Sequence, residues 1–168
     1  MPDTITIRPT LARDLPRVDA LLQASYTTLL RPDYPPSVLV TALPLIARAN
    51  PALLRSGTYF LAEDGDRRAL AVGGWSQTGP QGGIGPRDLG HVRHVATDPE
   101  MLRRGLATGI LERCFREARG AGMTWLLAQA TRTAVPFYRA MGFEDRAEIE
   151  VTLRPGITFP AVEMACAL

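Results

Sequence analysis

The sequence predicts an α/β protein in which helices cover the faces of a mixed sheet. Several short segments alternate apolar with polar residues, a pattern that is typical of β-strands. Between them, other segments repeat apolar residues about every 3.6 positions, which is typical of amphipathic helices. The segments follow one another as strand, two helices, three strands, helix, strand, helix and two strands. This order and the chain length predict a single domain over residues 1–168.

The N-terminal third is expected to contain one strand and two helices. Residues 4–8 alternate and indicate a short strand. Asp14 is a residue type that favours a helix N-terminus, so we expect the first helix to begin beside it. Ser37 is expected to cap a second, less regular helix, and Pro44 and Asn50-Pro51 limit its length.

The middle of the chain predicts a hairpin followed by a third strand. Residues 58–63 and 69–76 are rich in strand-forming side chains, and the Asp-Gly-Asp sequence between them indicates a tight turn. Residues 77–90 contain many glycines and prolines and are expected to form a surface loop. Residues 91–97 mix Val and Thr with polar side chains, and Asp98-Pro99 is expected to end that strand.

The C-terminal part predicts a helix, a strand, a helix and two strands. A single apolar stripe predicts a helix from about residue 104 to residue 120. Residues 124–130 are typical of a buried strand, and residues 133–141 predict a short helix. Residues 148–154 and 161–167 are expected to be the last two strands, joined by a turn.

The composition, with 46% hydrophobic and 21% charged residues, is that of a soluble globular protein. The net charge is +2, and every basic side chain is an arginine, spread along the chain rather than clustered as nucleic-acid binding requires. No apolar run approaches the roughly 20 residues of a membrane helix, and the N-terminus does not resemble a signal peptide. We therefore expect a cytoplasmic protein that binds neither nucleic acid nor membrane. Cys114 and Cys166 are expected to be free thiols rather than metal ligands.

One strand-to-helix turn has the features of an anion site. Its residues are Arg103, Arg104, Gly105, Leu106, Ala107 and Thr108. The first backbone N–H groups of a helix have no partner within the helix, and the helix dipole adds about half a positive charge there. The small residues Gly105 and Ala107 allow a phosphate to approach the backbone, and the two arginines offer charge-assisted contacts. The alternative is an ordinary helix start with solvated arginines.

Two segments in this region resemble motifs of the GNAT (general N-acetyltransferase) superfamily. Residues 98–107 (DPEMLRRGLA) are similar to its Arg/Gln-x-x-Gly-x-Gly/Ala acyl-CoA motif, and residues 134–143 (AVPFYRAMGF) to its Ala-x-x-Phe-Tyr-x-x-x-Gly-Phe motif. Residues 73–76 (GGWS) also resemble the third strand of these enzymes. Two positions depart from the family pattern: Leu102 stands where Arg or Gln is usual, and Thr131 replaces an Asn.

The resemblance implies a GNAT-like fold, with a mixed, mostly antiparallel sheet of six to seven strands, splayed central strands and about four helices. It also implies an enzyme that moves an acetyl group from acetyl-CoA to a primary amine by direct attack, without a metal. The pantetheine of acetyl-CoA would lie along Val95, Ala96 and Thr97, and its pyrophosphate at the anion turn. Tyr138 occupies the position that protonates the leaving thiolate in this family. Because a phenol titrates about 1.5 units above a thiol, we expect Tyr138 to act chiefly as a hydrogen-bond donor or to have a lowered pKa.

The attacking amine must lose a proton, so a base is expected near the acetyl group. We expect this base to be His91, which shares one strand face with Arg93 and Val95 and stands where the family often has its base. His94 is expected on the other face unless a bulge shifts the register. Glu63 and a water molecule are the remaining candidates.

The acceptor is expected to be a small-molecule or peptide amine. In this fold Tyr26, Tyr34 and Trp75 would lie near its pocket, although aromatic residues more often serve the core. The alternative function is a catalytically silent module that binds CoA for regulation. A nucleotide phosphate site is a weaker alternative, because the chain has no lysine and no lysine-containing phosphate loop. The apolar last strand is compatible with a homodimer.

Overall fold

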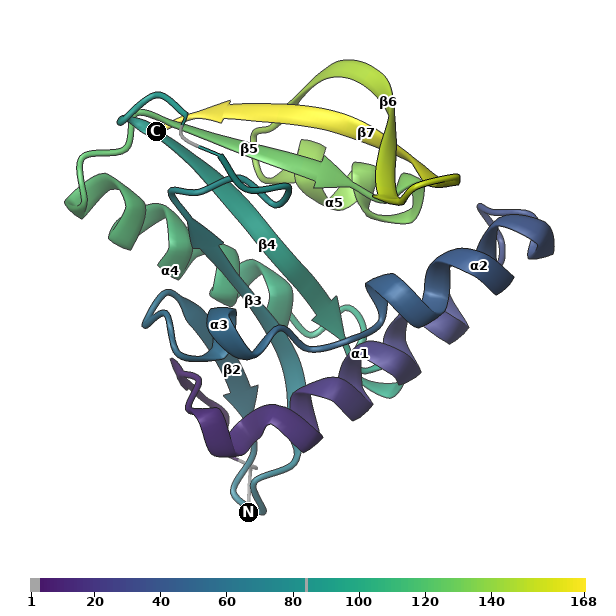
Figure 1. Ribbon diagram of the computed structural model, residues 1–168. Helices are drawn as coiled ribbons and strands as arrows, with labels where there is room; N and C mark the ends of the chain where they lie inside the picture. The colour runs from purple at the N-terminus through teal and green to yellow at the C-terminus, as the bar shows by residue number, and fades with distance from the viewer. Residues whose placement is uncertain (1–3, 84) are drawn as a thin grey trace.

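The structure is a computed structural model that describes residues 4–83 and 85–168 of the chain. The first three residues, where a signal peptide would begin, and residue 84 of the expected surface loop lie outside this described part. A seven-stranded sheet runs through the described residues, with α1 (Leu15–Leu29) and α2 (Pro36–Ile46) on one face and α4 (Leu106–Gly120) on the other (Figure 1). The predicted fold class, a mixed and mostly antiparallel sheet between helices, is confirmed.

The strands are β1 (Thr6–Pro9), β2 (Tyr59–Glu63), β3 (Ala69–Ser76), β4 (Leu89–Thr97), β5 (Trp125–Ala130), β6 (Glu144–Arg154) and β7 (Ile157–Ala167). They lie in the order β1-β2-β3-β4-β5-β7-β6, and all neighbours are antiparallel except β4 and β5. The parallel pairing joins only residues 89–91 of β4 to residues 125–127 of β5. Beyond this point the two strands diverge, which confirms the expected splayed centre of the sheet (Figure 1).

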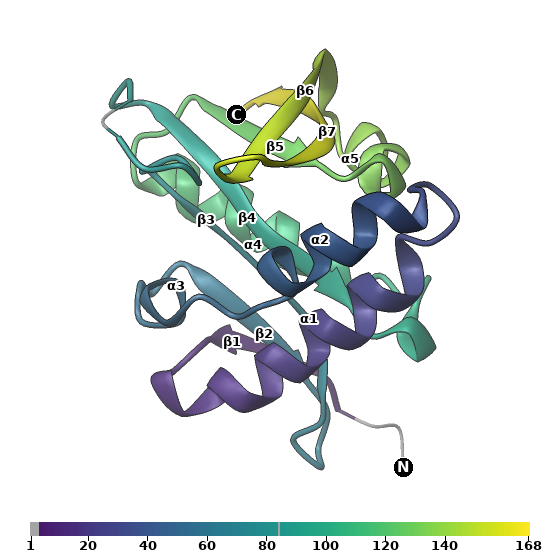
Figure 2. The ribbon, with the colours of Figure 1, turned by 45° about the vertical axis from the view of Figure 1, so that its right-hand side comes forward.

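Helices cover both faces because the central strands are apolar on both faces. Phe60 of β2 belongs to the core cluster that contains Ile110 of α4, whereas the next residue, Leu61, belongs to the cluster that contains Leu22 of α1. This alternation is the two-residue period of a strand that is buried on each side. The helix α1 crosses β3 and β4, and α2 extends to the β6–β7 hairpin (Figure 2).

The described chain has five α-helices, where about four were expected. The helix α5 (Val135–Ala140) matches the predicted short helix. The additional helix is α3 (Pro51–Leu54), a single turn. Asn50 caps α3, because its side-chain oxygen accepts hydrogen bonds from the backbone N–H groups of Ala52 and Leu53 at 3.0 and 3.3 Å.

Two details expected for the second helix, the cap at Ser37 and the limit at Pro44, are wrong, whereas the helix does end before Asn50-Pro51. Ser37 lies inside the first turn of α2 instead of capping it, and the helix continues through Pro44. A proline inside a helix removes the hydrogen bond to the carbonyl four residues earlier, here that of Val40. The Val40 residue is 71% exposed, so water can reach this part of the helix and bind the free carbonyl.

The last two strands start earlier than predicted, at Glu144 and Ile157 rather than near residues 148 and 161. Their first residues lack a clear apolar alternation, but the two strands pair along almost their full length, and this pairing supplies the backbone hydrogen bonds. Pro160 is tolerated in β7 because the pairing with β5 ends at Val162.

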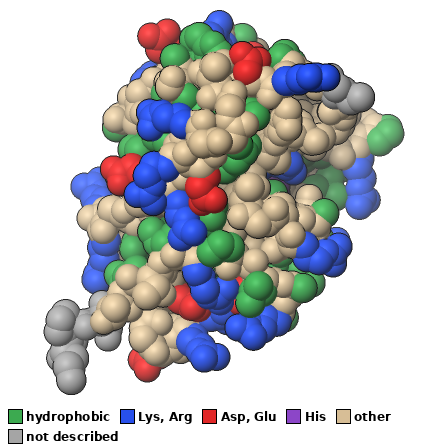
Figure 3. Space-filling view, turned by 90° about the vertical axis from the view of Figure 1, so that its left-hand side faces the viewer, with side chains coloured by type: hydrophobic (Ala, Val, Ile, Leu, Met, Phe, Trp, Pro, Cys, Tyr) green, Lys and Arg blue, Asp and Glu red, His purple; other side chains and the backbone are tan. Residues whose placement is uncertain are grey.

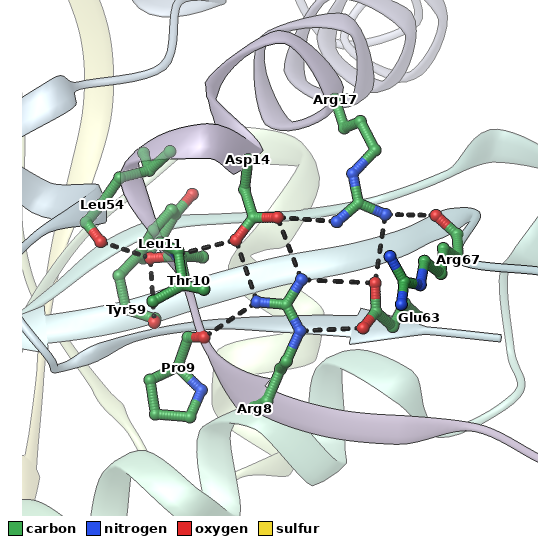
Figure 4. Close-up of polar contacts among 10 residues, drawn as sticks. All are labelled: Arg8, Pro9, Thr10, Leu11, Asp14, Arg17, Leu54, Tyr59, Glu63 and Arg67. Atoms are coloured by element: carbon green, nitrogen blue, oxygen red, sulfur yellow. Dashed lines mark hydrogen bonds and ion pairs between the residues drawn. The ribbon is translucent and has the colours of Figure 1, made fainter. Parts of the chain in front are cut away.

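Asp14 stands at the N-terminus of α1, but its side chain does not cap the helix. Its carboxylate accepts hydrogen bonds from Arg8 (two at 2.9 Å), from Arg17 (2.6 Å) and from the backbone N–H of Leu11 (2.7 Å), as Figure 4 shows. Both arginines also bind the carboxylate of Glu63, at 2.8 and 3.1 Å. We call Arg8, Asp14, Arg17 and Glu63 the ion-pair network. It ties β1, α1 and β2 together.

One face of the molecule carries many arginines. On this face, shown in Figure 3, arginines occur from the top to the bottom of the molecule, with acidic side chains between some of them. None of the helices in the described part of the chain combines the length and the apolar character that crossing a membrane requires.

Candidate active site

A β-bulge in β4 shapes the middle of the site. Val72 pairs with Ala96 and Gly74 with Arg93, so two residues of β4, His94 and Val95, stand opposite Gly73 alone. His94 has a φ of 43°, in the left-handed region. A side chain at Gly73 would not fit, because an added Cβ would lie 2.9 Å from Cγ2 of Val95.

Tyr59 of β2, which lies two strands away from β4, fixes the bulge. Its hydroxyl donates a hydrogen bond of 2.9 Å to the backbone carbonyl of His94. The Tyr59 side chain is buried, and burial raises its pKa well above the usual value, so it remains a neutral donor. Neither His94 nor Val95 has a paired residue on β3, and past His91 β4 has no pairing with β5. The bulged segment therefore has backbone groups free for another ligand.

A cavity of about 450 Å³ opens beside this segment. It lies between the α1–α3 region, the β3–β4 loop, β4, the end of β5 and the β6–β7 hairpin. We call it the β4 cavity. Its polar lining residues are Tyr26, Arg48, Asn50, Gln81, Arg93, His94, Gln129 and Thr131.

The loop between β3 and β4 is held against β5 by a pair of amides. Gln81 donates a hydrogen bond of 3.0 Å to the side-chain oxygen of Gln129, and Gln129 returns one of 2.8 Å. Both side chains line the β4 cavity. This reciprocal pair closes one side of the cavity with neutral groups.

The structure separates the candidate bases. His94 lines the β4 cavity, because the bulge changes the register of the strand, whereas His91 does not line it. The ring of His91 lies close to Gly79 of the β3–β4 loop, with Cε1 and Nε2 each 3.5 Å from the position of an added Cβ. Glu63 belongs to the ion-pair network and does not line the cavity.

Both histidines are poor proton acceptors in this structure. Burial, with a smaller contribution from the charge of Arg93, lowers the pKa of His94 to about 4. Burial also lowers the pKa of His91, and Arg93 adds to this effect. Both imidazoles are therefore neutral near pH 7, and His94 is the weaker base.

Tyr138 lies on α5 and is buried in the same core cluster as α4. Its ring stacks on Phe137 with centroids 5.3 Å apart and meets the edge of Phe143 at 5.2 Å. Burial raises its pKa, with smaller contributions from Tyr26 and Cys114. A lowered pKa, one of the two states expected from the sequence, is therefore not found, and Tyr138 keeps its proton.

The three aromatic residues expected near the acceptor have different positions. Tyr26 lines the β4 cavity, and burial raises its pKa to about 12. Tyr34 is a core residue that stacks on Phe159 and donates a hydrogen bond of 2.7 Å to the carbonyl of Pro160. Trp75 is also buried in the core and does not line the cavity.

The predicted anion turn leads into α4, whose N-terminus has no side-chain cap. Arg103 and Gly105 have φ values of 61° and 76°, and α4 begins at Leu106 without a side-chain cap. Arg103, Arg104 and Gly105 are exposed, as is Thr108. Leu102 is also exposed, so its side chain leaves the turn accessible. The first N–H groups of α4 are therefore available to an anion.

The strand residues expected along the cofactor lead towards this turn. Val95 and Thr97 are partly buried, and Ala96 is buried against the α1 side of the sheet. Arg68 binds the carboxylates of Asp98 and Glu100 at 2.8 and 2.9 Å, which fixes the chain between β4 and α4.

Sequence reasoning missed two residues of the cavity. Arg93 was noted only because it shares a strand face with His91, and Arg48 was not noted at all. An arginine inside a strand that also contains buried valines is the one signal that the sequence offered for Arg93. No local pattern marks Arg48, whose place depends on how α2 ends.

The chain belongs to the GNAT acetyltransferase family, because residues 55–145 match the family model described as "Acetyltransferase (GNAT) domain". The expected family is therefore confirmed. A GCN5-related N-acetyltransferase structure from Rhodopseudomonas palustris is 19% identical, with a TM-score of 0.75 over 98% of this chain and 96% of that one. The PaiA N-acetyltransferase of Thermoplasma acidophilum, solved with coenzyme A, is 12% identical, with a TM-score of 0.72 over 98% and 99% of the two chains.

A third similar structure is a Mycobacterium tuberculosis protein in complex with CoA, at 17% identity and a TM-score of 0.63 over 97% and 99% of the two chains. Among curated proteins, no sequence matches this chain significantly. The likenesses to solved structures establish the fold.

Proposed function

We propose that this protein transfers an acetyl group from acetyl-CoA to a primary amine by direct attack of the amine on the thioester. The observation that carries the proposal is the arrangement of three features along one strand. β4 separates from β5 after His91, it bulges at His94 beside the β4 cavity, and it leads to the uncapped start of α4. The CoA complexes of two similar structures support the choice of cofactor.

The chain's residues fit the two ends of acetyl-CoA. The first N–H groups of α4, with Gly105 in the left-handed region and Arg103 and Arg104 exposed, suit the pyrophosphate. We assign Leu106, Ala107 and Thr108 to the same contact. Val95, Ala96 and Thr97, on the edge of β4 without a β5 partner, suit the pantetheine, which can bind in the manner of an added strand.

In this reaction the amine nitrogen first forms a bond to the carbonyl carbon, and the carbonyl oxygen gains negative charge. The C–S bond then breaks and releases the thiolate. We assign the stabilisation of that oxygen to a backbone N–H near Val95, in the bulge. One well-placed donor of this kind is worth about 3 kcal/mol in a transition state.

We assign Tyr138 to the leaving thiolate. Because burial raises the pKa of Tyr138, the phenol keeps its proton and stabilises the sulfur by donating a hydrogen bond. Complete proton transfer would be unfavourable, since a phenol is the weaker acid of the two.

The proton that the ammonium group loses has two candidate acceptors on β4. His91 is the residue expected from the sequence, but His94 is the one that lines the β4 cavity. We therefore propose that His94, and not His91, is the base nearest the amine. Because the pKa of His94 is about 4, this residue does not change its charge between pH 5 and 7, and it should produce no step in the rate there. The rate is expected to rise with pH because the amine itself loses its proton.

The test is acetyl-CoA-dependent thiol release with a panel of amines, for the wild type and for Tyr138→Phe. We expect Tyr138→Phe to lower kcat by about 100-fold while the Kd for acetyl-CoA stays within about threefold, since the loss of one hydrogen-bond donor to a developing negative charge has an effect of that size. Tyr34→Phe is the matched control, because it removes a buried hydroxyl outside the site and should lower the Tm but not kcat.

Binding of acetyl-CoA without thiol release from any amine would instead favour the regulatory module. His91→Asn and His94→Asn separate the two bases, and asparagine tolerates the positive φ at position 94. A rate loss confined to His91→Asn would contradict the assignment of His94.

A further inference from the structure

Arg93, a partly buried cation in the lining of the β4 cavity, has no carboxylate partner among residues 4–83 and 85–168. One terminal nitrogen of Arg93 donates a hydrogen bond of 2.9 Å to the hydroxyl of Ser76. The Nε atom of Arg93 is buried and has no hydrogen-bond partner, and no carboxylate of residues 4–83 and 85–168 forms a salt bridge with this side chain. A guanidinium has five N–H donors, so most of those of Arg93 remain available.

An unpaired cation in this position costs free energy. Burial lowers the pKa of Arg93, which is the direction that desolvation without a counter-ion produces. A ligand that carries a negative charge would remove this cost and would also use the free donors.

The rest of the cavity lining carries no negative charge. Arg48 is a second cation of the lining, and no Asp or Glu of the described residues contributes to it. A polyamine or an aminoglycoside would bring further positive charge beside these arginines, which is unfavourable. The lining therefore selects against polycationic acceptors and favours an amine that also carries a carboxylate.

We propose that the acceptor is an α-amino acid with an apolar side chain, whose carboxylate is bound by Arg93. This inference rests on the proposed acetyl transfer and names the substrate class for it. The planar fork of a guanidinium matches the two oxygens of a carboxylate, and Arg48 adds positive charge at the exposed side of the cavity.

The remaining lining supports both the size and the apolar character of this acceptor. Ile46, Val151, Leu153 and Phe159 form an apolar wall contributed by α2 and the β6–β7 hairpin. The volume of about 450 Å³ lies in the lower part of the range of roughly 300 to 1,000 Å³ for small-molecule sites. A single amino acid is therefore a better match than a folded protein terminus.

The direct test is a calorimetric titration with N-acetylleucine and N-acetylleucinamide, in the presence and absence of CoA. The two compounds differ only at one group, where a neutral carboxamide replaces the carboxylate. We expect the acid to bind the wild type at least about tenfold more tightly than the amide, since a hydrogen bond to a charged group contributes about 1.5 to 3 kcal/mol, equivalent to roughly 10- to 150-fold.

Three variants show whether Arg93 causes this preference. Arg93→Gln should bring the two affinities to within about threefold, and Arg93→Lys should keep part of the preference, because it keeps the charge but loses the fork. Arg116→Gln, on the exposed face of α4, is the matched control and should keep the full preference. Equal binding of acid and amide to the wild type, binding of neither, or a preference that survives Arg93→Gln would overturn the proposal.

The rate of thiol release with different amines then distinguishes the amino-acid acceptor from the acetyl transfer on which it rests. Leucine should release thiol from acetyl-CoA with a kcat/KM at least about tenfold above that of leucinamide or 3-methylbutylamine. If amines without a carboxylate react equally well, the acetyltransferase function stands and the amino-acid acceptor is wrong. If N-acetylleucine binds through Arg93 but no amine releases thiol, the carboxylate site stands and the transfer reaction is wrong.

Discussion

The ion-pair network and the β4 cavity use the same kind of side chain in opposite ways. In the network, Arg8 and Arg17 each bind both Asp14 and Glu63, so every charge has an opposite partner within the fold. In the cavity, Arg93 binds only a hydroxyl, and Nε has no partner. The first arrangement contributes to the stability of the folded chain, whereas the second leaves N–H donors of Arg93 free to bind a ligand. Pairing within the fold is thus what distinguishes a structural arginine from a candidate binding arginine.

The largest effect should follow from breaking the network at its most buried member. Asp14→Ala removes one of the two carboxylates that Arg8 and Arg17 share, and the Asp14 side chain is only 1% exposed. The two arginines are partly exposed, which reduces the cost, so we expect a loss of about 2 to 3 kcal/mol. Thermal unfolding should show a Tm lower by roughly 5 to 10 °C. An unchanged Tm would mean that the network contributes no stability.

The network also predicts how stability depends on pH. The hydrogen bonds from Arg8 lower the pKa of Asp14 and of Glu63 in the folded state. A carboxyl with a lowered folded pKa stabilises the protein above its unfolded pKa of about 4, and this contribution is lost as the pH falls further. We therefore expect the wild-type Tm to fall between about pH 5 and pH 3, measured by thermal melts. Asp14→Asn should show a clearly shallower fall over the same range, and an equally steep one would contradict the assignment.

His94 predicts a second, separate pH effect. Its folded pKa of about 4 lies below the ordinary value of about 6.5, so protonation favours the unfolded chain, and stability is lost as the pH falls from about 6.5 towards 4. NMR titration of the two imidazoles should give one resonance that titrates near pH 4, and His94→Asn should remove it. A titration of that resonance near 6.5 would show that His94 is not buried in solution.

The smallest effect on stability is expected for the cavity arginine. Arg93→Gln removes a partly buried charge that has no counter-ion, so the Tm should stay within about 2 °C of the wild type or rise slightly. A fall as large as that expected for Asp14→Ala would show that Arg93 serves the fold instead of a ligand.

Much of the fold follows from local patterns. The strands β2 and β3 and the helix α4 were predicted within about two residues, because their apolar periods are long and regular. The limits of α2, β6 and β7 were predicted less well. α2 continues through Pro44 beside the exposed Val40, and the starts of β6 and β7 depend on their pairing with each other. Asp14 has the residue type of a helix cap, but the choice between capping and ion pairing depends on Arg8 and Arg17 being close in space.

The candidate site was predictable to a smaller extent. The anion turn is local, and glycine and arginine at fixed spacing indicate it. The face on which His94 lies depends on the bulge, and the bulge depends on the close approach of Gly73 to Val95 from another strand. The unpaired state of Arg93 is a property of all its neighbours together, so no pattern in the sequence indicates it.

The most direct measurement for the proposed function is the Tm with and without acetyl-CoA, at about one hundred times the Kd. Binding to the folded state alone adds about 2.7 kcal/mol, which corresponds to roughly 5 to 11 °C for a chain of this size. We expect a shift of that order with acetyl-CoA and none with ATP. No shift with acetyl-CoA, or an equal shift with ATP, would contradict the assignment of the strand β4 and the α4 turn to acetyl-CoA.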